Sequence, residues 1–168
     1  MIAVVLMIIS LLLDGILSNF LPFLVNDLSF FTPMFSIVCI FICYPFYRKS
    51  EIKYYIILFV FGIIYDLFYT NLLFLDGCLF VILGYFSYYL QKVFGLGYFK
   101  MIIYAMVMVC TYEVLFSLIL FVYNMVPITI TMVLYKIVHS LILNILYLEL
   151  LYVIVKIIPK KYKKINLN

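Results

Sequence analysis

Long apolar runs separated by short polar gaps make up nearly all of this chain. A helix needs about 20 mostly apolar residues to cross the hydrocarbon of a bilayer. Six runs approach or exceed this length: 2–20, 29–47, 54–71, 73–91, 101–123 and 128–155. The pattern predicts an all-α membrane protein, a six-span transmembrane helix bundle that forms one integral membrane domain over 1–168. The boundary between the third and fourth runs is marked only by Asn71, Asp76 and Gly77.

Basic residues occur almost entirely in three clusters between these runs. They are Arg48, Lys49 and Lys53, then Lys92 and Lys100, then Lys156, Lys160, Lys161, Lys163 and Lys164. Cytoplasmic loops of membrane proteins accumulate Lys and Arg, so both termini are predicted to be cytoplasmic. The outer connections, near Asn26–Asp27, Asn71–Asp76 and Asn124–Pro127, have no Lys or Arg.

The composition also indicates a membrane protein, and the charge indicates which partners it binds. The chain is 70% hydrophobic and 11% charged, too apolar for a water-soluble domain of 168 residues. Its net charge of +4 comes from the basic clusters and does not indicate nucleic acid binding. The basic cytoplasmic tail, 156–168, is expected to lie on anionic membrane lipids through Lys160, Lys161, Lys163 and Lys164.

Apart from Asp76, which is assigned to the turn between the third and fourth runs, six ionisable side chains fall inside the predicted spans: Asp14, Asp66, Glu113, Lys136, His139 and Glu149. A charge at the bilayer centre costs about 2.5–3.5 kcal/mol, so such groups are expected to face the bundle interior and to pair. At about 1.5 Å of rise per residue, four of them are predicted to lie at nearly one depth. These are Asp14, Asp66, Glu113 and Lys136. We hypothesise a buried polar network centred on Lys136, with Asp66 as its first partner and Glu113 and Asp14 next.

Spacing along two runs agrees with inward-facing polar groups. Gly62, Asp66 and Tyr69 share one helix face, where a small residue allows close helix approach. In the sixth run a stripe with helical spacing is formed by Lys136, His139, Ser140, Leu143, Asn144 and Tyr147. The network is interpreted as helix packing or as a site for a ligand or a proton.

No pattern of catalytic or metal-binding residues is found in the sequence. Cys39, Cys43, Cys78 and Cys110 are scattered through apolar runs, and His139 is the single histidine, so no zinc set is predicted. No nucleophilic triad or phosphate-binding glycine loop is present either. We therefore expect no catalytic residue, no cofactor and no metal.

The segment Phe61-Gly62-Ile63-Ile64-Tyr65-Asp66-Leu67-Phe68-Tyr69-Thr70 resembles the third-span signature of the rod shape-determining protein MreD family. The family's Gly and Asp match Gly62 and Asp66, and Glu113 matches an acidic residue found in the fifth span of many members. Leu143-Asn144 is similar to the family's Leu-Asn pair. Members often have a proline a few residues before that Asn, where this chain has His139, so the chain departs from the pattern that gives the family its helix bend.

This resemblance implies a non-enzymatic, multi-pass subunit of the bacterial cytoplasmic (inner) membrane. It would belong to the cell-elongation (rod) complex, with an MreC-like membrane protein as its main partner. An MreB-like cytoskeletal protein and peptidoglycan synthases would act in the same complex. The alternative is the substrate-binding subunit of an energy-coupling-factor vitamin transporter, which is also a small six-span bundle. In such subunits small residues spaced by three on the first helix let a coupling protein dock, whereas Ala3, Ser10 and Gly15 here lack that spacing.

Overall fold

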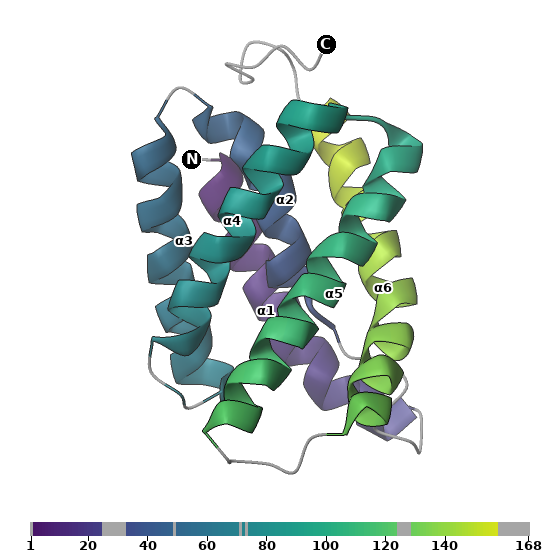
Figure 1. The fold of residues 1–168 in the computed structure, drawn as a ribbon. Coiled ribbons are helices and arrows are strands. Elements are labelled where there is room, and N and C mark those ends of the chain that lie inside the picture. The colour runs from purple at the N-terminus through teal and green to yellow at the C-terminus, as the bar shows by residue number, and fades with distance from the viewer. Residues whose placement is uncertain are drawn as a thin grey trace.

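The computed structural model describes residues 2–24, 33–48, 50–70, 72, 74–123 and 129–157, and within these all regular elements are helices. The elements are α1 (Ile2–Leu24), α2 (Phe35–Tyr47), α3 (Glu51–Tyr65), the π-helical turn η1 (Asp66–Thr70), α4 (Leu75–Phe94), α5 (Tyr98–Val122) and α6 (Ile130–Ile157). They form one bundle of helices lying roughly along a common axis (Figure 1). The all-α expectation is thus confirmed for the described residues. The lysines predicted to bind lipid in the tail, from Lys160 to Lys164, lie outside these residues, as do Asn26–Asp27 and Asn124–Pro127.

Five apolar helical segments of the described chain are long enough to cross a membrane. They are Ile2–Phe20, Glu51–Thr70, Leu75–Phe94, Tyr98–Val122 and Ile130–Ile157. The exception is α2, whose 13 residues rise only about 20 Å, short of the roughly 30 Å of hydrocarbon. The helix predicted over 29–47 in fact begins at Phe35, and Pro33 and Met34 precede it in a non-helical conformation.

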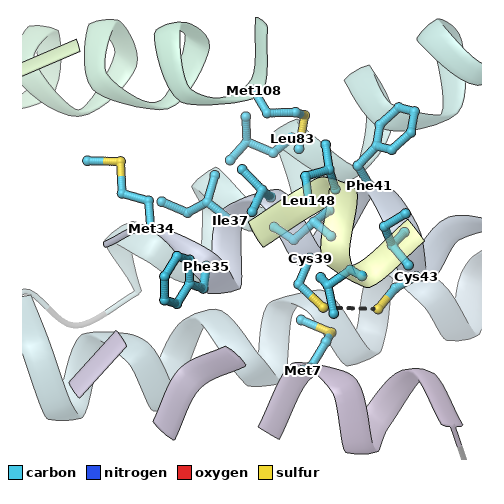
Figure 2. Close-up of a cluster of buried hydrophobic side chains, with 14 of the residues drawn as sticks. Met7, Met34, Phe35, Ile37, Cys39, Phe41, Cys43, Leu83, Met108 and Leu148 are labelled. Carbon is cyan, nitrogen blue, oxygen red and sulfur yellow. Dashed lines mark hydrogen bonds between the residues drawn. The ribbon is translucent and has the colours of Figure 1, made fainter. Parts of the chain in front are cut away.

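The short helix α2 lies at the centre of the bundle and contacts all five of the other α-helices. Every residue of 33–45 is buried, and six α2 side chains are fully inaccessible. Figure 2 shows side chains of other helices converging on it, among them Met7 of α1, Leu83 of α4, Met108 of α5 and Leu148 of α6. Such surroundings explain why the sequence of α2 is apolar on all sides, as a helix enclosed by protein must be.

Consecutive helices pack against each other as antiparallel neighbours, α1 with α2, α3 with α4, and α5 with α6. This alternation brings the basic connections together at the end of the bundle where α1 begins and α6 ends (Figure 1). Arg48, Lys53, Lys92 and Lys100 are all exposed there. Lys156 at the end of α6 donates a hydrogen bond to the hydroxyl of Tyr98, 3.3 Å away at the start of α5.

The helices on both sides of the third connection extend further toward it than the predicted gap Asn71–Asp76 and its marker Gly77 indicated. Helical structure continues through η1 to Thr70, and Asp76 and Gly77 belong to the first turn of α4 rather than to a turn between helices. Phe74, just before α4, has a φ of 70°, in the left-handed region that residues with a side chain rarely occupy. Asp66 at the start of η1 and Asp76 in the first turn of α4 are neighbours, and their side chains interact.

Candidate functional site

The polar groups of the bundle gather where two helices begin inside it. The first N–H groups of a helix have no partner within the helix. In an apolar interior each unpaired group costs several kcal/mol, so a helix that starts there needs acceptors from elsewhere. The described residues supply such acceptors at the start of α2 and at the start of α4.

The start of α2 is capped by side chains of α1 and α6. The Asp14 carboxylate accepts the Phe35 N–H at 2.6 Å and the Ser36 N–H at 2.8 Å, one with each oxygen. The Asn144 amide oxygen accepts the Met34 N–H at 2.9 Å. A negative charge is also favourable at the positive end of the helix dipole. These contacts explain how α2 can begin within the bundle, and they occupy backbone groups that an anionic ligand would need.

The start of α4 is capped from η1. Asp66 is fully buried, and its Oδ1 atom accepts the Asp76 N–H at 2.9 Å while Oδ2 accepts the Gly77 N–H at 3.3 Å. The Thr70 hydroxyl donates a third hydrogen bond to Oδ1 at 3.0 Å. Gly62, four residues before Asp66, permits the approach, because a Cβ there would lie 2.5 Å from the Asp76 carbonyl oxygen and from the Gly77 Cα.

Asp76 is the main residue of this site that sequence reasoning missed. It was taken as a loop residue, whereas the structure buries it completely. Its Oδ1 atom accepts a hydrogen bond from the Tyr112 hydroxyl of α5 at 2.9 Å. The available signal was the spacing: Asp76 follows Asp66 by ten positions, just enough for a short turn between two helices.

Two tyrosines near these caps interact with other helices. The Tyr65 hydroxyphenyl group is buried and interacts electrostatically with Asp14, Asp76 and Glu113, which come from three different helices. Tyr69 donates from its hydroxyl to the Leu11 carbonyl of α1 at 2.7 Å. The face predicted to contain Gly62, Asp66 and Tyr69 therefore packs against α4 through its first two residues and reaches α1 through the third.

The polar stripe predicted on α6 divides into an inner and an outer part. Ser140, Asn144 and Tyr147 are buried, and the Tyr147 hydroxyl lies 2.7 Å from the Ser10 hydroxyl of α1. Lys136 is exposed, and His139 is half-buried with its Nδ1 atom 2.7 Å from the Tyr135 carbonyl oxygen. The inner part faces the start of α2, where Asn144 forms its cap.

The hypothesis that Lys136 is the centre of the network, with Asp66 as first partner, needs correction. Asp66 obtains its hydrogen bonds from Thr70 and from two backbone N–H groups, while the Lys136 side chain is exposed on α6. Lys136 instead interacts electrostatically with the buried Glu113 of α5. Backbone donors at helix starts take the role that had been assigned to the lysine, because those N–H groups have no other partner.

This arrangement makes a prediction for double-mutant cycles. Lys136→Met and Glu113→Gln are expected to be non-additive in their effects on unfolding free energy, with a coupling of about 0.5 kcal/mol or more. Lys136→Met and Asp66→Asn, which share no partner, should add within about 0.5 kcal/mol. Equilibrium unfolding in mixed detergent micelles measures both cycles. Additive effects in the first cycle and non-additive effects in the second would instead indicate that Lys136 pairs with Asp66.

The described residues offer no group of three or more His, Cys, Asp or Glu side chains placed to hold a metal ion. Cys39 and Cys43 are buried side by side with their sulfur atoms 3.8 Å apart, Cys78 is exposed, and Cys110 is half-buried. The side chains at the two helix starts carry carboxyl, amide and hydroxyl groups, which exchange hydrogen bonds with backbone N–H groups and with one another.

No family model, curated protein or solved structure matches the chain. The fold itself defines a class: five apolar helices of spanning length indicate a helical membrane protein, in which the buried Asp14 and Asp66 carboxylates cap helix starts within the bundle.

Proposed function

We propose that the protein is a non-enzymatic subunit of the bacterial cell-elongation complex, in which it helps to maintain rod shape. The observation that carries the proposal is the Phe61–Thr70 segment, which resembles the MreD signature. Its Gly and Asp are the residues that join α3 to α4 here, Gly62 through close backbone approach and Asp66 through the cap. These two residues serve helix packing rather than catalysis. Such a role fits the proposed non-enzymatic subunit.

The proposed mode of action is lateral contact between helices. Large apolar side chains are exposed along α1 and α6, on faces turned away from the bundle. On α1 they are Val5, Ile8, Ile9, Leu12, Ile16 and Phe20. We propose that an MreC-like membrane protein binds such a face, and that MreB-like filaments and peptidoglycan synthases are linked through this partner.

The topology proposed with this function places both termini in the cytoplasm of a bacterium, with the chain in the cytoplasmic membrane. The exposed basic residues at one end of the bundle support it, since cytoplasmic ends of membrane proteins carry the excess of Lys and Arg. The four lysines from Lys160 to Lys164 would then bind anionic headgroups on that side. In this proposal α2 fills the bundle interior beside the full-length spans.

The alternative, a vitamin-binding transporter subunit, is less well supported by the first helix. Docking of a coupling protein there would need small residues on an outward face. Ala3 and Ser10 are buried in the bundle, and Gly15 lies against the Tyr69 hydroxyl. The small residues of α1 therefore pack within the chain.

Complementation tests the proposal. In a rod-shaped bacterium depleted of its own MreD, expression of this chain is expected to restore rod shape, and an MreC-like protein should co-purify with it. The Gly62→Ala variant should fail in both assays, whereas Gly97→Ala, where a Cβ would meet only the flexible Lys100 side chain, should succeed. Round cells despite membrane insertion, together with a tightly bound vitamin in the purified protein, would favour the transporter instead.

A further inference from the structure

Two carboxyl groups lie next to each other at the start of α4 and differ in the hydrogen bonds that they receive. Asp66 accepts three: from the Asp76 N–H, the Gly77 N–H and the Thr70 hydroxyl. Two of these donors belong to the first turn of α4, whose dipole also favours a negative charge. Asp66 therefore has the surroundings of a stabilised carboxylate anion.

Asp76 has the opposite surroundings. Its side chain is fully buried, and its Oδ1 atom accepts one hydrogen bond, from the Tyr112 hydroxyl. Its Oδ2 atom is buried and has no hydrogen-bond partner among the described residues. A carboxylate oxygen without a donor is strongly disfavoured in an apolar interior, whereas a protonated oxygen can itself donate.

The two carboxyl groups are close enough to share a hydrogen bond. Two carboxylates cannot form a hydrogen bond with each other unless a proton lies between them. Two carboxyl groups at hydrogen-bonding distance are also rarely both ionised, because their negative charges repel. We propose that Asp66 and Asp76 form a binding site for a single proton, which resides on Oδ2 of Asp76 and is shared with the Asp66 carboxylate. The Thr70 hydroxyl, which interacts with both carboxyls, completes the site.

The surroundings of Asp76 favour its neutral form. Its side chain is completely buried, and the negative charge of the Asp66 carboxylate lies beside it. The hydrogen bond from the Tyr112 hydroxyl of α5 acts in the opposite direction, because a donor stabilises the carboxylate. Tyr65 of α3 interacts electrostatically with Asp76, Asp14 and Glu113, and Lys136 of α6 acts on Glu113. Burial and the neighbouring charge outweigh the single hydrogen bond, so the site holds its proton.

Release of this proton has a structural consequence. It would leave two negative charges, on Asp66 and Asp76, where η1 leads into α4. Close to this point Gly62 brings the backbones of α3 and α4 into contact. Repulsion would act on this contact directly, so the α3–α4 hairpin is the part of the bundle that responds to the loss of the proton. This inference does not depend on the proposed function.

Infrared spectroscopy of the full chain in lipid nanodiscs tests the proposal. A protonated carboxyl group has a C=O stretching band that carboxylates lack. The wild-type protein is expected to show one such band that shifts when aspartate is labelled with carbon-13 at its carboxyl group. The band should be lost in Asp76→Asn and retained in the control variants Asp14→Asn and Glu113→Gln.

Stability of the two asparagine variants provides an independent measurement. In Asp76→Asn the amide N–H can donate to Asp66 as the proton does, so the variant is expected to fold and to melt close to wild type. Asp66→Asn replaces an acceptor oxygen by a donor that faces backbone N–H groups, and a clear loss of melting temperature is expected. A wild-type spectrum without an aspartic acid band, a band that persists in Asp76→Asn, or failure of Asp76→Asn to fold would each overturn the proposal.

Discussion

Replacing Gly62 by alanine is expected to cost the bundle about 2–3 kcal/mol of unfolding free energy, although alanine is the better helix former. In an exposed helix the exchange would gain roughly 1 kcal/mol. Here the new Cβ would lie 2.5 Å from the Asp76 carbonyl oxygen and the Gly77 Cα. Both are backbone atoms, so no side-chain rotation relieves the clash, and overpacking of this kind typically costs 1–3 kcal/mol or more.

The measurement for Gly62→Ala is equilibrium unfolding in mixed micelles, with Gly97→Ala as the matched control. Gly97 has an extended backbone with φ −177°, which any residue adopts, and a Cβ there would meet only the flexible Lys100 side chain, at 3.6 Å and beyond. The control should lose less than about 1 kcal/mol, because Gly97 is the N-cap residue of α5 and alanine is the poorer cap there. Equal stability of the two variants would mean that α3 and α4 do not meet through Gly62.

Replacing Asp14 by alanine is the second change for which a large effect is expected, a loss of about 3 kcal/mol or more. The substitution leaves the N–H groups of Phe35 and Ser36 without their acceptor inside the bundle. Each buried donor left unsatisfied costs about 1–3 kcal/mol. Because α2 contacts every other α-helix, loosening of its start should affect the whole bundle. Asp14→Asn, which keeps one acceptor oxygen, should lose less.

Glu51→Ala is the matched control for Asp14→Ala. Glu51 is also an acidic residue near a helix start, in the first turn of α3, but its side chain is exposed. Only its interaction with the helix dipole is lost, about 0.3–1 kcal/mol. Thermal melting of both variants in detergent decides the matter. Similar losses for Asp14→Ala and Glu51→Ala would show that α2 does not depend on a cap from α1.

Some features of the site were accessible from sequence patterns and others were not. The helical spacing of Gly62 and Asp66 predicted a shared face, because residues four apart must lie on one side of a helix. The partner of Asp66 was assigned wrongly, since the pattern of charged side chains contains no information about free backbone N–H groups. The pairing of Lys136 with Asp66 was predicted only from their similar depths in the membrane. In the structure α5 packs against α6, so that Lys136 interacts electrostatically with Glu113.

The sequence by itself determined the class of this protein, since so apolar a chain needs a lipid-like environment, and its apolar runs of about 20 residues have the length of membrane-spanning helices. It also determined the alternation of basic and uncharged connections. The tertiary structure alone decided that α2 is short and central, and which polar groups meet. The caps of α2 join residues 21 and 110 positions apart, and no local pattern of side chains specifies contacts over such distances. They exist because the backbone groups of a buried helix start must find acceptors, and only the packed bundle determines which side chains reach them.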